Sequence, residues 1–129
     1  MHKTILLFVA FVAVAASGNI HAQSQEDGSH YLRVCSAAVK MSDGKELTQE
    51  ESLGALYCVS YISGFLDSMS LTAKFTKGKR TVCTPERGVS NDQAARLLVK
   101  YLRANPETLH ESGRMSLYLA LQKAFPCTK

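Results

Sequence analysis

The sequence predicts an all-α protein, a compact bundle of about four helices stapled by two disulfide bonds. Two observations support this fold class. Apolar residues recur at helical spacing behind residues that cap helix starts, and no segment alternates apolar and polar residues as a strand would. Four cysteines follow an N-terminal export signal, and an even number of cysteines in an oxidising compartment usually forms disulfide bonds.

The first 22 residues have the pattern of a cleaved signal peptide. A positive start with Lys3 precedes an unbroken apolar run over residues 5–16, and a small polar tail ends at Ala22. This run is too short for a membrane helix, which needs about 20 apolar residues. We therefore expect export, cleavage after Ala22 (Ala16 and Gly18 are weaker choices), and a mature chain that does not insert into a membrane.

The expected mature chain, residues 23–129, suits a single helical domain. It keeps 14 Lys and Arg residues, because only Lys3 lies in the leader, against 11 Asp and Glu residues, so its net charge is +3. It has no Trp, and its five Tyr residues are scattered and not interleaved with basic residues, as a stacking platform for nucleic acid requires. The composition therefore does not favour nucleic-acid binding.

Two capping boxes mark the starts of the two clearest helices. Thr48 and Glu51 form the first box, and the apolar residues that follow at i, i+4 spacing predict one long helix over residues 49–73. Ser90 and Gln93 form the second box. The helix that it opens should stop before the next proline, because the residue before a proline is pushed out of the helical backbone region.

Two shorter helices complete the bundle. Ser29 is the expected cap of the first, over about residues 29–41, and the last is expected over about residues 112–124. Pro106 is expected to begin a short turn through His110 between the last two helices. The residues expected to face the core are Ala94, Leu97, Leu98, Tyr101 and Leu102 in the third helix, and Met115, Tyr118 and Leu119 in the fourth.

The helix positions decide between the three possible pairings of the four cysteines. Cys35 and Cys58 lie within two turns of the corner between the first two helices, whereas Cys83 precedes the third helix and Cys127 follows the fourth. Antiparallel neighbours with short connections bring each of these pairs together. We therefore predict Cys35–Cys58 and Cys83–Cys127 disulfides, which the chain-entropy model values at about 3.4 and about 4 kcal/mol. The cysteines are too widely spaced for a zinc site.

The residues around the cysteines form an ordered set of fragments between about residues 31 and 127. The set consists of Cys35; Cys58, Tyr61, Gly64 and Asp67; Cys83 and Pro85; Tyr101 and Leu102 with Pro106 and Leu109; and Ala120 and Leu121 followed by Phe125, Pro126 and Cys127. In order and spacing it resembles the Rap/Tai family of periplasmic immunity proteins, which guard bacteria against cell-wall amidases delivered by type VI secretion. The resemblance implies a helical, disulfide-bonded fold without catalysis or cofactor, frequent homodimers, and inhibition by surface loops inserted into the hydrolase's active-site cleft.

Most of the family residues are expected to have structural roles. Gly64 would permit the close approach of another helix, and Tyr61 would be packed with its hydroxyl group bonded. Asp67 would accept bonds from a loop N–H or pair with an arginine. Phe125 would fill the core beside a disulfide, and Pro126 would end the last helix. Direct contact with a partner is the alternative for the first three.

Two surface segments are the candidates for partner binding. The first, residues 74–80, carries the cations Lys74, Lys77, Lys79 and Arg80, with no acidic residue nearby in the sequence. It is either a solvated loop or an electrostatic contact for an acidic partner, which would weaken with salt. The second, residues 105–114, is either a plain connector or an exposed loop that probes a partner. Its candidate contact residues are His110, Glu111 and Arg114.

The sequence does not favour an enzyme. His30 and His110 are the only histidines beyond the leader, both are expected to be solvated, and neither belongs to a nucleophile motif. A Cys–His pair would need a free thiol. Three functions stay open: inhibition of a periplasmic amidase, a chaperone or stress role in the periplasm, and the carriage of an apolar ligand. The family resemblance favours the first.

Overall fold

The computed structural model describes residues 26–75 and 80–127. The predicted signal peptide lies outside this range. The described residues form α1 (Gly28–Ser42), α2 (Gln49–Phe75), α3 (Asn91–Ala104), the short 3-10 helix η1 (Pro106–Thr108) and α4 (Gly113–Ala124). They contain no β-strand, only two isolated bridges that pair Asp27 with Ser112 and Val82 with Pro126. The predicted all-α fold is confirmed.

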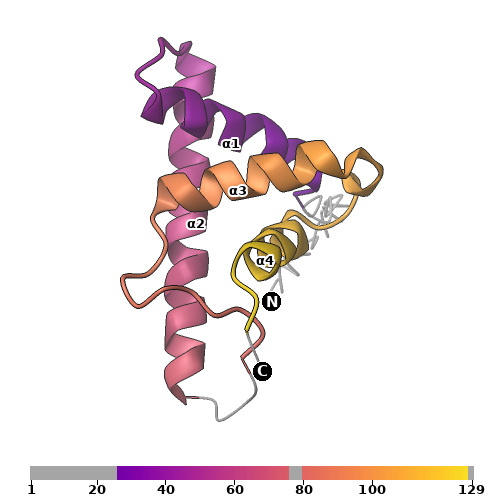
Figure 1. The fold of residues 1–129 in the computed structure, drawn as a ribbon. Helices are drawn as coiled ribbons and strands as arrows, with labels where there is room; N and C mark the ends of the chain where they lie inside the picture. Colours follow the sequence, from indigo (N-terminus) through magenta and orange to yellow (C-terminus); the bar gives the residue numbers. More distant parts are fainter. Residues whose placement is uncertain (1–25, 76–79, 128–129) are drawn as a thin grey trace, which may run out of the picture.

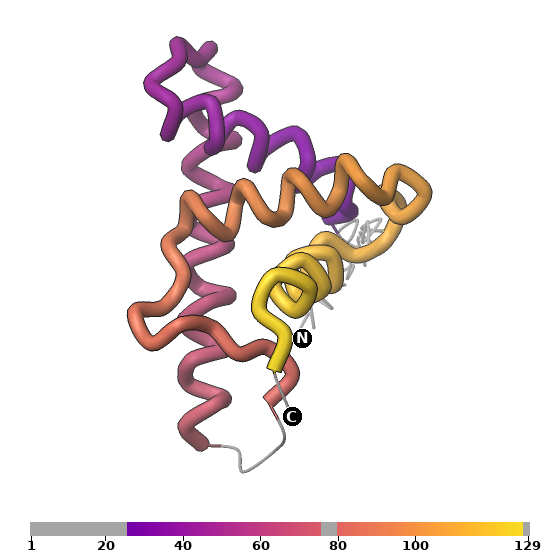
Figure 2. The backbone as a smooth tube through the Cα atoms, in the orientation of Figure 1, coloured from indigo at the N-terminus to yellow at the C-terminus, as the bar shows by residue number. Residues whose placement is uncertain are grey.

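α2 is a long rod, and α1 and α3 cross it on the side that faces the viewer in Figure 1. α1 packs against both α2 and α3, and α4 packs mainly on α3. The segment that follows residue 80 turns back along the second half of α2 before α3 begins, as the tube in Figure 2 shows. No other helix of the described chain covers the opposite side of α2, which faces away from the viewer in Figure 1.

The helix starts follow the capping pattern with one exception. The Glu51 N–H donates to Thr48 Oγ1 at 3.2 Å and the Thr48 N–H donates to Glu51 Oε2 at 3.0 Å, which confirms the first capping box. The Gln93 N–H donates to Ser90 Oγ at 3.1 Å at the start of α3. The expected cap of α1 at Ser29 is wrong. The cap is Asp27, whose carboxylate accepts the His30 N–H at 2.9 Å.

The core lies where all four helices meet. Its largest fully buried side chains are those of Cys35, Cys58, Ile62, Leu98, Leu102, Leu117 and Leu121. The inward face of α3 agrees with the prediction, although Leu97 and Tyr101 are only partly buried. For α4 the predicted face is wrong at Met115, which is 51% exposed. Apolar residues surround most of α4, so periodicity alone could not choose the buried face.

Two disulfide bonds join Cys35 to Cys58 and Cys83 to Cys127, the same pairs that the helix positions predicted. The first bond is fully buried between α1 and α2. The second ties the segment after α2 to the end of the chain. There the Cys83 N–H also donates to the Phe125 carbonyl at 2.9 Å. The last helix and the segment before α3 are therefore fixed to each other at this point.

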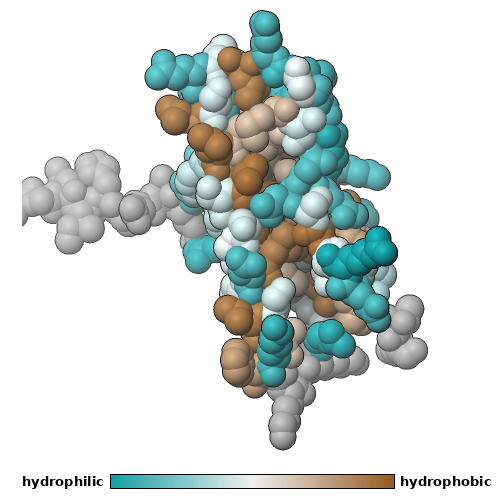
Figure 3. Space-filling model, turned by 90° about the vertical axis from the view of Figure 1, so that its left-hand side faces the viewer, coloured by the Kyte–Doolittle hydropathy of each residue, from teal (hydrophilic) through white to brown (hydrophobic). Residues whose placement is uncertain are grey.

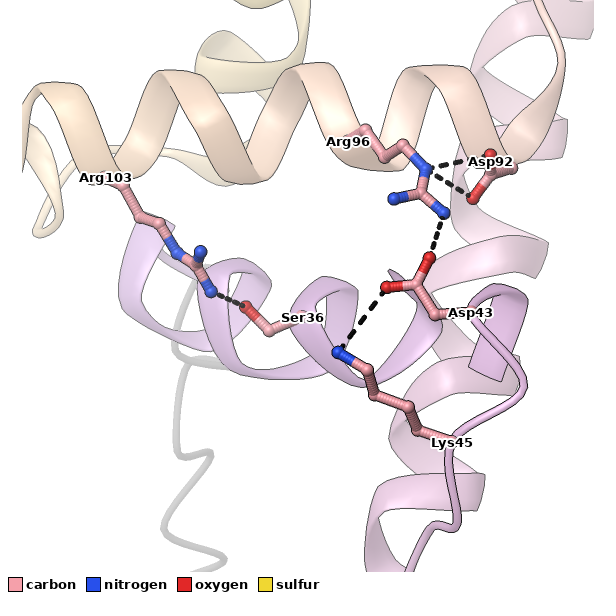
Figure 4. A network of polar contacts seen from close by, with 6 residues as sticks. All are labelled: Ser36, Asp43, Lys45, Asp92, Arg96 and Arg103. Carbon is pink, nitrogen blue, oxygen red and sulfur yellow. Dashed lines mark hydrogen bonds and ion pairs between the residues drawn. The ribbon is translucent and has the colours of Figure 1, made fainter. Parts of the chain in front are cut away.

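A polar seam connects α1 and α3 on their exposed side (Figure 4). Arg96 on α3 is its centre: its Nε donates to Asp92 at 3.0 Å, and one of its terminal nitrogens donates to Asp43 at 2.6 Å. Lys45 also lies 3.8 Å from Asp43. These contacts lower the pKa of Asp43 and of Asp92, because Arg96 donates to both carboxylates. The seam joins the start of α3 to the end of α1.

Candidate functional site

The connection over residues 105–114 is anchored to the start of α1. The Gly28 N–H donates to the Glu111 carbonyl at 2.9 Å, and the Gly113 N–H donates to the Glu26 carbonyl at 3.1 Å. η1 adds one helical turn, which begins at Pro106 as the sequence predicted. The backbone of the connection is therefore held by a segment that lies about 80 residues away in the sequence.

The candidate contact residues of this connection remain free to meet a partner. His110, Glu111 and Arg114 are exposed, and within the described residues none of them forms an ion pair. The solvated position that was predicted for His110 is confirmed. A backbone that is already ordered, with exposed polar side chains, loses little conformational entropy when a partner binds.

Gly113 is required for this anchoring. A Cβ atom at Gly113 would lie only 1.9 Å from Cδ2 of Tyr31. Because Tyr31 is 2% exposed, its ring has little room to move aside. Contact between the Gly113 backbone and this ring therefore sets how α4 lies on α1, and it also selects which face of α4 is buried.

A cluster of rings that the sequence analysis missed lies behind the connection. The ring centroids of Tyr31 and Tyr61 are 4.6 Å apart, and those of His30 and Tyr57 are 5.3 Å apart. The hydroxyl groups of Tyr31 and Tyr57 both donate to the carboxylate of Glu26. Burial, with the nearby Tyr61 and Glu26, raises the pKa of Tyr31, so this hydroxyl stays protonated as a donor. The i, i+4 spacing of Tyr57 and Tyr61 was the only sequence signal for this cluster.

Two expectations for polar atoms in this cluster are wrong. His30 is not solvated: it lies half-buried in α1, and its Nε2 is buried without a hydrogen bond among the described residues. The Tyr61 hydroxyl is also buried and has no hydrogen-bond partner there. Burial raises the pKa of Tyr61. The Tyr61 ring packs as predicted. His30 Nε2 lies 3.7 Å from the Glu26 carboxylate, and His30 Nδ1 lies 3.4 Å from a terminal nitrogen of Arg33.

The described cations of the basic segment over residues 74–80 are Lys74 and Arg80, which lie away from residues 105–114. Lys74 is exposed in the last turn of α2. Arg80, the first residue of the second described range, is also exposed. Lys77 and Lys79 lie outside the described residues. The next residues are anchored, because the hydroxyl groups of Thr81 and Tyr118 bond to each other and the second disulfide follows.

A hollow of about 240 Å³ lies between the second half of α2 and residues 80–91. Asp67 and Arg80 both line it. The bond predicted for Asp67 is not formed, because this exposed carboxylate has no hydrogen bond or ion pair with any residue in the described ranges. α2 turns this side chain toward solvent, and the loop beside it does not reach the carboxylate.

The structure does not bring the two predicted segments together. Residues 105–114 lead into the start of α4, whereas Arg80 lies beside the disulfide at the end of α4. α4 has 12 residues, which corresponds to a length of about 18 Å at 1.5 Å per residue. A partner that contacted both segments would have to extend along this helix.

The side of α2 that faces away from the other helices is apolar, and the sequence analysis missed it. We call it the α2 outer face and define it by Leu53, Ser60, Gly64, Ser68, Leu71 and Phe75; Tyr57, at its edge, packs against His30 of α1. Leu53 is 63% exposed, Leu71 55% and Phe75 82%. Figure 3 views the molecule from the left of Figure 1 and shows hydrophobic side chains in separate groups among hydrophilic ones. The expected packing of Gly64 against a helix is wrong within the described chain, because a Cβ atom there would meet nothing within 4 Å.

The length of α2 could have revealed this face. α2 has 27 residues and α1 has 15, which correspond to about 40 Å and about 22 Å. The shorter helices cannot cover such a rod, and apolar residues occur all around it. A helix that is hydrophobic on all sides is usually buried on all sides.

Comparison with known proteins places the whole described fold in one family. The model of the Rap1a immunity proteins matches residues 27–127, from the α1 cap to the last cysteine. The chain belongs to the Rap1a immunity protein family. No curated protein and no solved structure matches it. The predicted family resemblance is confirmed, and membership indicates an immunity protein that binds a partner effector.

In this Rap1a family member the prolines of the family fragments lie at turns and helix ends. The Gly88 N–H donates to the Pro85 carbonyl in a turn, and Pro106 begins η1. α4 ends at Ala124, and Phe125 packs against the core next to the second disulfide. Pro126 pairs with Val82 just beyond the helix. These residues shape the scaffold that holds the exposed segments.

The cysteines of this Rap1a family member are not available as free thiols. All four cysteines are in disulfide bonds. The described residues contain no group of three His, Cys, Asp or Glu side chains that could hold a metal ion. Over residues 26–75 and 80–127, no helix is both long and apolar enough to cross a membrane.

Proposed function

We propose that this protein is a periplasmic immunity protein that binds a peptidoglycan amidase delivered by type VI secretion and inhibits it by occluding its active site. The match of the Rap1a family model to residues 27–127 carries the proposal, because it includes all four helices and both disulfides. The protein itself performs no catalysis. We also propose that residues 1–22 direct export and are removed, which leaves a single domain over residues 23–129. The two disulfides suit an oxidising compartment.

Residues 105–114 are the proposed inhibitory segment. Hydrogen bonds to the start of α1 hold their backbone, and His110, Glu111 and Arg114 are exposed on it. Loops on a rigid scaffold are frequent sites of recognition. An ordered segment of this kind could fill an active-site cleft at a low entropic cost.

The basic segment is proposed to guide the approach of the amidase. Lys74 and Arg80 are exposed and, within the described chain, neither forms an ion pair. Exposed cations at the edge of an interface mainly raise the association rate, and salt reduces their effect. We expect the basic segment to influence how fast the complex forms more than how slowly it dissociates.

A wall-hydrolysis assay tests the proposal. The mature protein is added to the amidase encoded beside it, and the release of peptidoglycan fragments is followed. We expect inhibition that is complete near one protein chain per amidase. Hydrolysis at the uninhibited rate despite excess protein would contradict the proposed function.

A variant of the proposed inhibitory segment sharpens this test. We expect replacement of His110, Glu111 and Arg114 by alanine to weaken inhibition by about tenfold or more, as the removal of an energetically central contact does. The matched control replaces Arg87 and Lys123, which are also exposed, and should inhibit like the wild-type protein. Circular dichroism should show the same helix content for all three proteins.

The protein is also proposed to act as a homodimer, so that one assembly holds two amidases. The α2 outer face supports this proposal, because soluble monomers rarely expose a long apolar strip. Sedimentation velocity of the mature protein tests it. A single species with the mass of one chain at micromolar concentration would contradict the dimer and leave the proposed inhibition of the amidase standing.

A further inference from the structure

Glu26, the residue before the cap of α1, has a carboxylate that contacts groups from two helices. The Tyr31 hydroxyl of α1 donates to its Oε2 at 3.2 Å, and the Tyr57 hydroxyl of α2 donates to the same oxygen. Its Oε1 lies 3.7 Å from Nε2 of His30. Because hydrogen bonds to an ionised acceptor are stronger than those between neutral groups, these contacts hold the Glu26 side chain against α1 and α2.

The backbone of the same residue holds the proposed inhibitory segment. The Glu26 carbonyl accepts the Gly113 N–H at 3.1 Å, and the Gly28 N–H donates to the Glu111 carbonyl at 2.9 Å. An isolated antiparallel bridge lies between these two hydrogen bonds. The two short stretches therefore run side by side in opposite directions. A group that fixes Glu26 also fixes the backbone that carries the candidate contact residues.

This short pairing needs support from side chains. Residues 26 and 27 precede the first helix, and the first residues of a domain are poorly ordered unless they are tied down. An isolated two-stranded pairing is marginally stable at best. The bond from Asp27 to the His30 N–H ties the pairing to α1. Through Tyr57, the Glu26 carboxylate ties it to α2 as well.

The groups of this contact lie outside the core, so they can order the segment without controlling the whole fold. The Glu26 side chain is 41% exposed, and Tyr57 is 38% exposed. Neither belongs to the buried core, whose largest side chains include Ile62, Leu98 and Leu117. Substitutions of exposed residues usually change the stability of a domain little.

We infer that Glu26 is a positioning residue of this protein: its carboxylate, held by Tyr31 and Tyr57, orders the backbone of residues 105–114 for the partner. The inference rests on the proposed inhibitory role of this segment, to which it adds the residue that orders it. A segment that is ordered in advance loses less conformational entropy when it binds. Glu26 acts through the segment and does not need to touch the partner itself.

Amide hydrogen exchange of the mature protein alone tests the ordering. We expect Glu26→Ala to raise the exchange rates of the Gly28 and Gly113 amides by about tenfold or more, because a charged acceptor of two hydroxyl groups is lost. The Leu98 amide in the middle of α3 should exchange as in the wild type, since local opening does not require global unfolding. Tyr57→Phe removes one of the two donors and should raise the same glycine rates by a smaller factor.

Two further variants serve as controls. Tyr118→Phe removes a hydroxyl group that bonds to Thr81 instead, and it should leave both glycine amides at their wild-type rates. Glu26→Gln keeps an oxygen that accepts hydrogen bonds, so it should restore most of the protection that Glu26→Ala loses. Unchanged glycine rates in Glu26→Ala, or an equal rise at Leu98, would overturn the inference.

The wall-hydrolysis assay tests whether this order serves inhibition. We expect Glu26→Ala to inhibit the amidase about tenfold less well than the wild type because the segment must be ordered on binding, with a similar thermal midpoint. Glu26→Gln should recover most of the inhibition. Faster glycine exchange with wild-type inhibition would overturn the link to the partner. A wild-type protein that does not inhibit the amidase would contradict the proposed function, whereas the exchange rates alone decide whether Glu26 orders the segment.

Discussion

The two long sides of α2 have opposite relations to the rest of the chain. On the inner side Ala55, Cys58 and Ile62 are fully buried against the other helices, and Cys58 is bonded to α1. On the outer side Leu53 and Phe75 are exposed, although they are apolar like the buried residues of the inner side. The comparison teaches that this helix carries more apolar surface than its own fold can bury. The inner side should therefore control stability, and the outer side should control association.

A pair of truncations tests this division with the largest expected effect. Ile62→Ala should lower the free energy of unfolding by about 2–5 kcal/mol, because it leaves a cavity in a fully buried site. Leu71→Ala on the outer side should change it by less than about 0.5 kcal/mol. Urea unfolding at a concentration where the protein is monomeric measures both. Equal losses would show that the outer side also contributes to the fold of one chain.

Two glycine-to-alanine substitutions should change the free energy of unfolding in opposite directions. Gly113→Ala places a Cβ atom against the Tyr31 ring and should destabilise the protein by about 1–3 kcal/mol, as overpacking does. Gly64→Ala has open space around it and should stabilise the isolated chain by up to about 1 kcal/mol through helix propensity. Thermal unfolding of the two variants under the same conditions gives the comparison. A stabilised G113A protein would contradict the packing of α4 on α1.

Polar substitutions on the outer side should separate association from folding. Leu53→Ser with Leu71→Ser should raise the dimer dissociation constant by about tenfold or more, because apolar area would no longer be buried on association. The far-ultraviolet circular dichroism and the unfolding midpoint of the monomer should stay as in the wild type. Sedimentation equilibrium measures the constant. A double variant that dimerises as tightly as the wild type would exclude this face as the interface.

The smallest expected effect concerns the seam between α1 and α3. Arg96 lowers the pKa of Asp43 and of Asp92 below their ordinary value of 3.8. Their contribution to stability is complete above this value and is lost as the pH falls through the lowered pKa. The Arg96→Gln variant should therefore have a lower free energy of unfolding at neutral pH. Its free energy of unfolding should also fall less steeply than that of the wild type as the pH is lowered. Arg103→Gln is the control, because it removes only a bond to the Ser36 hydroxyl. Its free energy of unfolding should depend on acid pH as that of the wild type does.

The fold was predictable because its main signals are local. The capping residues Thr48 and Ser90 fixed two helix starts, and the positions of the helix ends then selected the cysteine pairs. The cap of α1 was missed because Asp27 is placed by its pairing with Ser112, which lies far away in the sequence. The exposure of Met115 on α4 was missed for a similar reason, since Gly113 and Tyr31, which position α4, meet only in the folded chain.

The candidate site was less predictable than the fold. Charge and loop composition identified residues 74–80 and 105–114, but the sequence could not show that Arg80 and residues 105–114 lie at opposite ends of α4. The ring cluster around Tyr31 and Tyr61 joins α1 to α2 through tertiary contacts alone. The apolar periodicity of α2 was visible, but without the packing of α1 and α3 it could not show which apolar residues stay exposed.

A calorimetric titration of the mature protein with the amidase encoded beside it tests the proposed immunity function most directly. We predict saturable binding at one amidase per chain, with an affinity that falls as the salt concentration rises. The absence of any binding heat at low and at physiological salt, with an amidase that is active on peptidoglycan and does not co-elute with the protein, would contradict the proposal.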